Sequence, residues 1–289
     1  MSKSRPDSGP EFHLDIRRTI APLDAGEAES ELKDLAVQAR EGGLKRLASL
    51  LEAESPQRDF LAGVLQLSDF LRDTARRDPA ILDGLFERTV ADRIAGVIEE
   101  IRLLPSDGGV TEASLMASLR LLKSEAHFLI ALADLAGEWE PCRTVQALSK
   151  LADAATGAAV DFLLGDAHRQ GKLRLPDSSN PSEGSGYIVL GMGKLGGGEL
   201  NVSSDVDLVF LHPSDAETAG PRPVSHHEFF TRAGRQVIAL LADVTADGFV
   251  FRVDMRLRPF GDSGPLVSSF GALEDYFIGQ ARPWGGYAW

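Results

Sequence analysis

The first half of the chain carries apolar residues at helical spacing. Between residues 27 and 172 the sequence is rich in Ala and Leu, and apolar positions recur every three or four residues. Ser55 places a capping residue directly before Pro56, which is typical of a helix start. The clearest apolar face comprises Leu115, Leu119, Leu122, Ala126, Leu129 and Ala133. We predict four to six helices in this region, packed as a bundle.

The pattern changes towards the second half. Residues 175–186 are rich in Pro, Ser and Gly and predict a linker. Beyond them, apolar runs at 187–190 and 206–211 predict strands, and residues 249–258 read as a further strand. A helix is predicted before that strand, with an apolar face of Phe230, Ala233, Val237, Leu240, Leu241 and Val244. The fold class is therefore α+β, with an N-terminal helical bundle followed by a domain with a small mixed sheet.

These changes in texture divide the chain into four segments. We predict a loose leader at residues 1–26, a helical domain at 27–174, the linker at 175–186 and a second domain at 187–289. A chain of 289 residues is long enough for two modest domains, each with its own core.

Composition narrows the class of protein. The formal net charge of -13 disfavours general binding to nucleic acid or to anionic membranes, since both reward a basic face. The one cysteine, Cys142, allows no disulfide framework, and a cytoplasmic setting is expected. The first twenty residues lack an apolar core, so we expect no signal peptide, and no apolar stretch is long enough to span a membrane.

A glycine-rich turn follows the first predicted strand. Gly191, Gly193 and Gly196 satisfy the G-x-G-x-x-G pattern of dinucleotide-binding folds. That motif must open a long helix, whereas the next strand begins near Asp205, only nine residues after Gly196. The spacing of a P-loop is not met either. The glycines still allow backbone N–H groups to approach a phosphate closely. Lys194, which lies within this turn, is a further candidate to bind the phosphate.

Two aspartates open the second predicted strand. Asp205 and Asp207 point to the same face, because side chains alternate along a strand. Neighbouring carboxylates repel unless a cation lies between them, and Mg²⁺ is the hard cation that prefers such oxygens. The alternative is a solvated strand face with two ordinary aspartates. The adjacent glycine turn favours the metal site.

A third carboxylate lies in the strand predicted at residues 249–258. Its apolar side consists of Phe251, Val253, Met255 and Leu257, and its polar side of Arg252, Asp254, Arg256 and Arg258. The polar side could be a surface ladder of ion pairs, which would stabilise the chain little. Beside two other carboxylates, however, Asp254 completes a two-metal arrangement, and arginines there can bind phosphate oxygens. His226, His227 and Glu228 are adjacent and share no helix face, so we expect them to open a helix rather than bind a metal.

Several motifs together resemble the glutamine synthetase adenylyltransferase family. The first signature runs through Gly191–Gly196, Glu199–Asn201 and Ser204–Asp207, and the second through Val253–Gly261 and Ser263–Leu266. Residues 130–136 and 148–153 are similar to the family's helical N-terminal section. The resemblance covers roughly residues 50–289.

The resemblance implies a polymerase-β-like nucleotidyltransferase domain and a role in nitrogen assimilation. Members of the family are bifunctional: a C-terminal copy attaches AMP from ATP to a tyrosine of glutamine synthetase. An N-terminal copy removes it by phosphorolysis, with inorganic phosphate as nucleophile and ADP as product. The PII signal protein and glutamine control the balance. The single signature after a helical section matches the adenylyl-removing half.

Roles follow for individual residues. Asp205, Asp207 and Asp254 are expected to hold two Mg²⁺ ions as the catalytic and metal-binding set. The expected nucleotide- and phosphate-binding set is Gly191, Gly193, Lys194, Gly196, Ser204, Arg256 and Arg258.

The sequence also departs from the family pattern. Gly198 and Val202 replace an arginine and an aromatic residue, and Trp284–Trp289 lacks a Glu-Arg pair. The chain then stops, so we expect a truncated member whose catalytic domain is incomplete at its C-terminus. An alternative function is therefore an inactive module that docks on glutamine synthetase or PII. A nucleic-acid polymerase with the same carboxylates is disfavoured by the net charge of -13.

Overall fold

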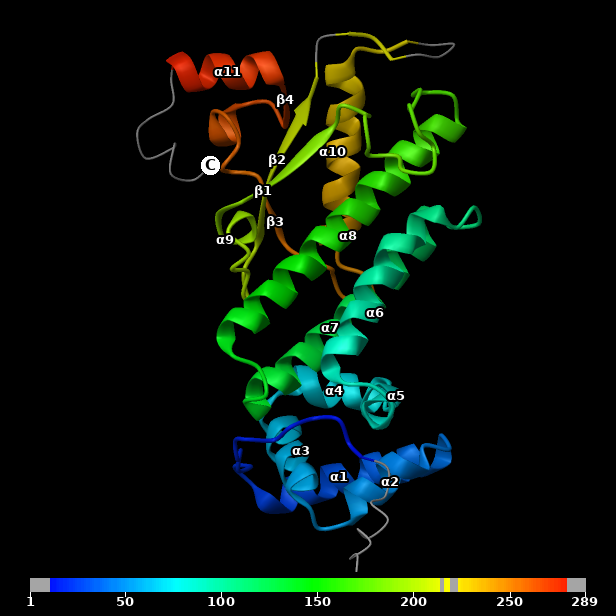
Figure 1. Cartoon of the computed structure of the whole chain (residues 1–289), viewed down its shortest axis with the longest axis vertical. Helices are drawn as coiled ribbons and strands as arrows, with labels where there is room; N and C mark the ends of the chain where they lie inside the picture. Colours follow the sequence, from blue (N-terminus) through cyan, green and yellow to red (C-terminus); the bar gives the residue numbers. More distant parts are fainter. Residues whose placement is uncertain (1–10, 214–215, 219–222, 280–289) are drawn as a thin grey trace, which may run out of the picture. The chain divides into compact units, whose positions relative to one another are not determined.

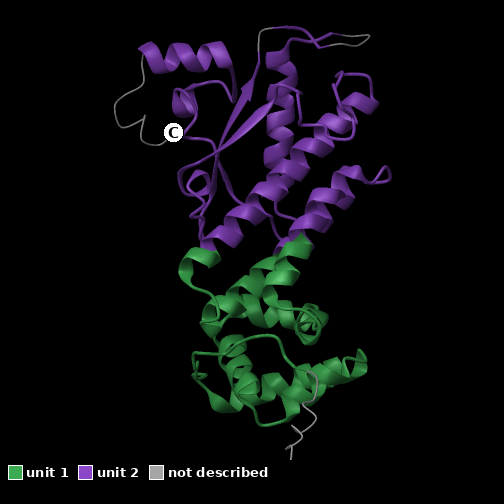
Figure 2. Cartoon of the chain, in the orientation of Figure 1, with its two compact units in different colours: residues 1–97, 124–144 green, residues 98–123, 145–289 purple. Residues whose placement is uncertain are grey.

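A computed structural model describes residues 11–213, 216–218 and 223–279. The chain forms two compact units, shown in different colours in Figure 2. Unit 1 contains residues 1–97 and 124–144, and unit 2 contains residues 98–123 and 145–289. The units divide the chain at other places than the predicted linker, and the domain boundary at residues 175–186 stays a prediction.

Unit 1 is built of helices. Its complete helices are α1 (Ala25–Glu41), α2 (Lys45–Glu52), α3 (Pro56–Leu67), α4 (Asp69–Arg77) and α5 (Ala80–Asp83). The chain then passes between the units within α6 (Val90–Leu103), α7 (Glu112–Ala136) and α8 (Pro141–Arg169). The helix α3 begins where predicted, because the Ser55 side chain accepts a hydrogen bond from the backbone N–H of Arg58.

The number of helices is larger than predicted. Residues 25–169, all of them described, contain eight α-helices instead of four to six. One cause is Ser68, which is extended (φ -133°) and both ends α3 and caps α4. Ser68 ends the helix although no glycine or proline is present there. A prediction from apolar spacing alone therefore treats α3 and α4 as one helix. The apolar face predicted within residues 115–133 is confirmed, because all six of its residues are buried in α7.

Residues 11–24, the described part of the predicted leader, have no regular secondary structure. They nevertheless pack on unit 1, with Phe12 and Leu14 buried. The backbone N–H of His13 donates to the carbonyl of Leu85 at 2.7 Å, and that of Arg17 to the carbonyl of Ala136 at 2.8 Å.

Unit 2 contains the small mixed sheet that the sequence predicts. Its strands are β1 (Ile188–Met192), β2 (Val206–His212), β3 (Val253–Asp254) and β4 (Val267–Ser269). On one edge of β2, β1 runs antiparallel. On the other edge, β3 and β4 both run parallel to β2, β3 beside its first residues and β4 beside its last. The mixed pairing places β2 at the centre of the sheet.

The strand predicted at residues 249–258 is much shorter than expected, since only Val253 and Asp254 pair with β2. The side chain of Asp254 accepts a hydrogen bond from the backbone N–H of Arg256 at 2.8 Å. Such a bond turns the backbone and competes with the strand ladder. Residues 256–257 accordingly form a turn.

The two faces of the sheet have different partners (Figure 1). On one face, Tyr187 stacks on Phe230 of α10 (His226–Ala242), with ring centroids 4.9 Å apart. On the other face, the buried cluster of Met192, Val209 and Leu211 packs against α11 (Phe270–Gly279).

The helix α10 confirms most of its predicted face. Its buried apolar side chains include five of the predicted six: Phe230, Ala233, Val237, Leu240 and Leu241. The prediction for Val244 was wrong, because the helix ends at Ala242 and Val244 is 79% exposed.

A buried arginine holds the end of α10. Arg120 of α7 is 1% exposed, and its guanidinium donates to the carbonyls of Leu240, Asp243 and Gly248. Carbonyls at a helix end lack partners within the helix, so Arg120 satisfies them. The chain that leaves this capped end leads directly to β3. None of the described helices is both long enough and apolar enough to cross a membrane.

Candidate functional site

The three aspartates predicted to act together lie on one face of the sheet. Asp207 of β2 and Asp254 of β3 are paired neighbours in the parallel register. Asp205 precedes β2 by one residue and shares the parity of Asp207. This is the face that packs on α11, away from α10. The structure therefore brings together carboxylates that are 47 residues apart in the sequence.

Asp207 is the aspartate of this group whose negative charge is least favourable. Its carboxylate is paired with no cationic side chain of the described residues, whereas the other two aspartates each have an arginine partner. Burial raises the pKa of the Asp207 carboxyl, and the charges of Asp254 and Asp205 raise it further. A cation beside Asp207 would relieve this repulsion.

Asp254 is held by Arg256. The Arg256 side chain contacts both carboxylate oxygens, with Nε 3.0 Å from Oδ1 and 2.7 Å from Oδ2. These hydrogen bonds hold the pKa of the Asp254 carboxyl below its usual range. The pair is asymmetric in exposure, since the Asp254 side chain is 12% exposed and the Arg256 side chain 73%. Arg256 thus reaches from solvent onto the carboxylate.

Asp205 is held by Arg252, a residue that the sequence singled out only as part of an alternating face. The Arg252 Nε atom donates to Asp205 Oδ1 at 2.5 Å. Its Nη2 atom donates to the carbonyl of Ser203, also at 2.5 Å. The parity of Arg252 and Asp254 in the sequence was the signal that could have identified this contact.

The glycine turn lies against the carboxylates. It forms the four-residue helix α9 (Gly193–Gly196) directly after β1. Gly193 has φ +51°, and a Cβ atom there would lie 2.9 Å from Asp207 Oδ2. At Gly196, a Cβ atom would lie 2.5 Å from the carbonyl oxygen of Gly191. Both positions therefore exclude a side chain, which brings the backbone of the turn close to Asp207.

The other polar residues of the first signature gather beside this turn. The Lys194 Nζ atom lies 3.4 Å from Ser204 Oγ, and Ser204 Oγ lies 2.8 Å from Asn201 Oδ1. Asn201 was not among the predicted site residues, although it lies within the quoted signature. The backbone N–H of Leu200 donates to Ser149 Oγ, which fixes this loop to α8.

Arg258 is the most buried arginine of the described segment after β3. Its side chain is 11% exposed, and Nη1 donates to the carbonyl of Met255 at 2.7 Å. The Nε atom is buried and has no hydrogen-bond partner among the described residues. Arg258 therefore supports the turn after β3, and its contact with a nucleotide stays a prediction.

The chemistry of the donors fits a hard divalent cation, although the side chains are not arranged as a ligand set. Among the described residues, no three His, Cys, Asp or Glu side chains form a ready metal site. The arginines explain this, because Arg256 covers both oxygens of Asp254 and Arg252 covers one oxygen of Asp205. Burial, and after it the charges of Asp254 and Asp205, raise the pKa of the Asp207 carboxyl, and a hard cation would neutralise the repulsion between these charges.

Comparisons with known proteins identify the family of this chain. The family model described as glutamate-ammonia ligase adenylyltransferase matches residues 59–289. This chain belongs to that family. It is 52% identical over 265 residues to the bifunctional glutamine synthetase adenylyltransferase/adenylyl-removing enzyme of Mesorhizobium japonicum, and 43% identical to that of Brucella suis. A Burkholderia mallei enzyme of the same name is 44% identical over 231 residues.

The matches cover most of this chain and a small part of each relative. The first two cover 92% of the chain and 27% of the relative, and the third covers 78% and 24%. The name of those longer enzymes includes both adenylylation and adenylyl removal. Among the predicted departures from the family pattern, Trp284–Trp289 lies outside the described residues.

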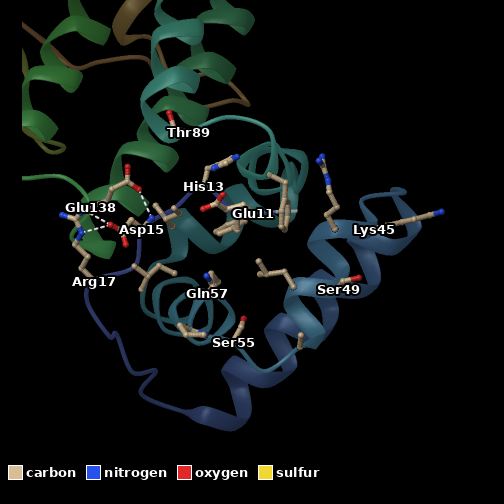
Figure 3. A pocket seen from close by; sticks show the side chains of 18 of the residues that line it. Glu11, His13, Asp15, Arg17, Lys45, Ser49, Ser55, Gln57, Thr89 and Glu138 are labelled. Atoms are coloured by element: carbon tan, nitrogen blue, oxygen red, sulfur yellow. Dashed lines mark hydrogen bonds and ion pairs between the residues drawn. The ribbon is translucent and has the colours of Figure 1, made fainter. Parts of the chain in front are cut away.

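A separate cavity of this family member lies in unit 1 (Figure 3). It has a volume of 1260 Å³, and several of its charged groups already have hydrogen-bond or ion-pair partners. Arg17 bonds to Asp15, whose backbone N–H donates to Glu138. Arg46 is paired with Asp83 and Glu87. The sheet face in unit 2, with its strained carboxylate, is the stronger candidate for catalysis.

Proposed function

We propose that this chain is a nucleotidyltransferase that acts on glutamine synthetase and removes AMP from its adenylylated tyrosine. The observation that carries the proposal is the pairing of Asp207 with Asp254 beside the backbone of Gly193. Carboxylates that repel one another next to a side-chain-free turn can hold a cation and a phosphate together. Membership of the family supports glutamine synthetase as the protein substrate of this site.

In this proposal, Asp205, Asp207 and Asp254 would hold Mg²⁺. The bound ions would neutralise the charge on the α-phosphate of the AMP group. The N–H groups of the glycine turn and the Lys194 ammonium bind phosphate oxygens, and Ser204 supports Lys194. Arg256 moves from Asp254 onto the incoming phosphate, which it can bind through two parallel hydrogen bonds.

The proposed reaction is a phosphorolysis. An oxygen of inorganic phosphate forms a bond to the α-phosphorus, and the bond between that phosphorus and the tyrosine oxygen breaks. The tyrosine oxygen takes up a proton, and the AMP group leaves as ADP. The direction follows from the position of the single signature after a helical section, as in the adenylyl-removing half of the family. ATP-dependent adenylylation, PII binding and a cytoplasmic setting remain proposals for the whole enzyme.

The test mixes the chain with adenylylated glutamine synthetase, Mg²⁺ and phosphate, and follows the release of ADP. Asp207→Asn should abolish release, because it removes the central carboxylate. The matched control is Asp275→Asn, which removes an exposed carboxylate on α11 and should leave release unchanged. If the folded chain binds glutamine synthetase yet releases no ADP, it is a docking module instead. Release that survives Asp207→Asn would refute the metal site.

A further inference from the structure

Arg252 makes contacts on both sides of Asp205. Its carbonyl accepts a hydrogen bond from the backbone N–H of Val206 at 2.9 Å. Its side chain donates to Asp205 Oδ1 and to the carbonyl of Ser203. One residue next to β3 therefore bonds to Ser203, two residues before Asp205, to Val206 directly after it, and to the Asp205 carboxylate itself.

We propose that Arg252 is a positioning residue that presents Asp205 to the catalytic cation. The inference rests on the proposed function of the site. Arg252 donates to Oδ1 of Asp205 through Nε alone, while its Nη2 atom donates to the carbonyl of Ser203. The other carboxylate oxygen, Oδ2, stays available to a cation. Hydrogen bonds from an outer residue commonly orient a metal-binding carboxylate in this way.

Arg256 gives the opposite arrangement on the same face. It contacts both oxygens of Asp254, so a cation can bind that carboxylate fully only after Arg256 has moved away. The two arginines have the same charge and both are exposed, at 57% for Arg252 and 73% for Arg256. Their geometry therefore predicts opposite effects on metal binding: Arg252 assists it and Arg256 competes with it.

Charge alone predicts a different result. A guanidinium near the site repels a divalent cation, so removing either arginine should tighten metal binding. Stability alone also predicts little, since exposed ion pairs contribute weakly to folding. Weaker metal binding after loss of Arg252 would run against the electrostatic trend. Such a result would identify a positioning role.

The experiment titrates the whole chain with Mn²⁺ and measures the dissociation constant by electron paramagnetic resonance. Arg252→Gln should raise the constant about tenfold, in the range expected for residues that orient metal ligands. Arg256→Gln should lower it. Arg252→Lys should lie between the unaltered chain and Arg252→Gln, because it keeps the charge and loses the planar fork. Thermal unfolding of each variant checks that it is folded.

The matched control is Arg232→Gln. Arg232 is an exposed arginine on α10 whose side chain pairs with Glu228. Its loss removes the same charge and the same kind of ion pair away from the carboxylates, so Mn²⁺ binding should not change. In the ADP assay, Arg252→Gln should need more Mg²⁺ for half-maximal rate and should approach the unaltered rate at saturating Mg²⁺.

The outcomes separate this inference from the proposed function. If the unaltered chain binds no Mn²⁺, or Asp207→Asn binds it equally well, the metal site and the role of Arg252 are both wrong. If Asp207→Asn abolishes binding but Arg252→Gln binds Mn²⁺ as tightly as the unaltered chain or more tightly, only the role of Arg252 is overturned.

Discussion

The two faces of the sheet in unit 2 differ in the charge that they carry. The face towards α10 is mostly apolar, with Leu208 and Phe210 buried, and a Cβ atom at Gly234 of α10 would lie 2.9 Å from the Phe210 ring. The buried His212 at the end of β2 stacks on Phe230. The face towards α11 has a buried apolar cluster at one end and the three aspartates at the other. There the carboxylates repel one another, and Asp207 has a raised pKa.

The difference shows that the alternation of side chains along β2 places residues that stabilise the fold on one face and the candidate catalytic residues on the other. Odd and even positions of one strand point to opposite sides, so a packed core and a charged site can share the same backbone. Changes on the α10 face should therefore act on folding, whereas changes on the aspartate face should act on turnover.

The largest effect is expected for Asp254→Asn. It should reduce ADP release about 10³–10⁴-fold, equivalent to about 4–5 kcal/mol in the barrier, because it removes a metal-binding charge. The unfolding temperature should change little, since the Arg256 partner is mostly exposed. Steady-state assays and thermal unfolding of the same preparation measure the two effects. A large loss of stability would contradict the separation of the faces.

On the opposite face, Phe210→Ala should lower the free energy of unfolding by about 3–5 kcal/mol. Phe210 is fully buried beside Tyr187, and its ring lies against α10 at Gly234. Denaturant titration measures the loss, and Leu121→Ala, which truncates an exposed leucine of α7, is the control. At a temperature where the variant is folded, Mn²⁺ affinity should be retained. A variant that unfolds normally but binds no Mn²⁺ would show that the faces are coupled.

Gly193→Ala should affect turnover more than folding. The added Cβ would lie 2.9 Å from Asp207 Oδ2, at a backbone φ of +51° that disfavours a side chain. We expect ADP release to fall about 10–100-fold and stability to fall by about 1 kcal/mol. Gly198→Ala is the control, because it also has positive φ but open space around its Cβ position. Equal losses in both variants would attribute the effect to backbone strain alone.

The smallest effect concerns the stability of the metal-free chain. A raised pKa means that the folded chain binds the Asp207 proton more tightly than the unfolded chain does. The contribution of Asp207 to the free energy of unfolding is fully present at pH values below the pKa of this carboxyl in the unfolded chain. It is lost as the pH rises through the higher pKa of the folded chain. At pH 7, Asp207→Asn should therefore stabilise the metal-free chain by about 0.5 kcal/mol after solvent screening, or about 1–2 °C. Thermal unfolding at pH 7 with a chelator measures this. A lower unfolding temperature would contradict the repulsion.

The sequence alone determined the features that depend on local periodicity. The apolar faces of α7 and α10 follow from spacings of three and four, and the shared face of Asp205 and Asp207 follows from a spacing of two. The glycine turn and the mixed sheet were also predicted. Local rules suffice here because each feature lies within one element. They failed where a side chain competes with the backbone, as at Ser68, which divides two helices, and at Asp254, which ends a strand after two residues.

The tertiary structure decided which distant residues meet. Asp254 lies beside Asp207 because β3 pairs in parallel with the start of β2, and a sequence pattern carries no record of strand register. The same pairing brings Arg252 onto Asp205, and the turn after β3 brings Arg256 onto both oxygens of Asp254. The types of residue in the site could be predicted from the sequence. The state of each carboxylate depends on contacts between segments of the chain. Arg252 holds one oxygen of Asp205, Arg256 covers both oxygens of Asp254, and Asp207 has no arginine partner among the described residues.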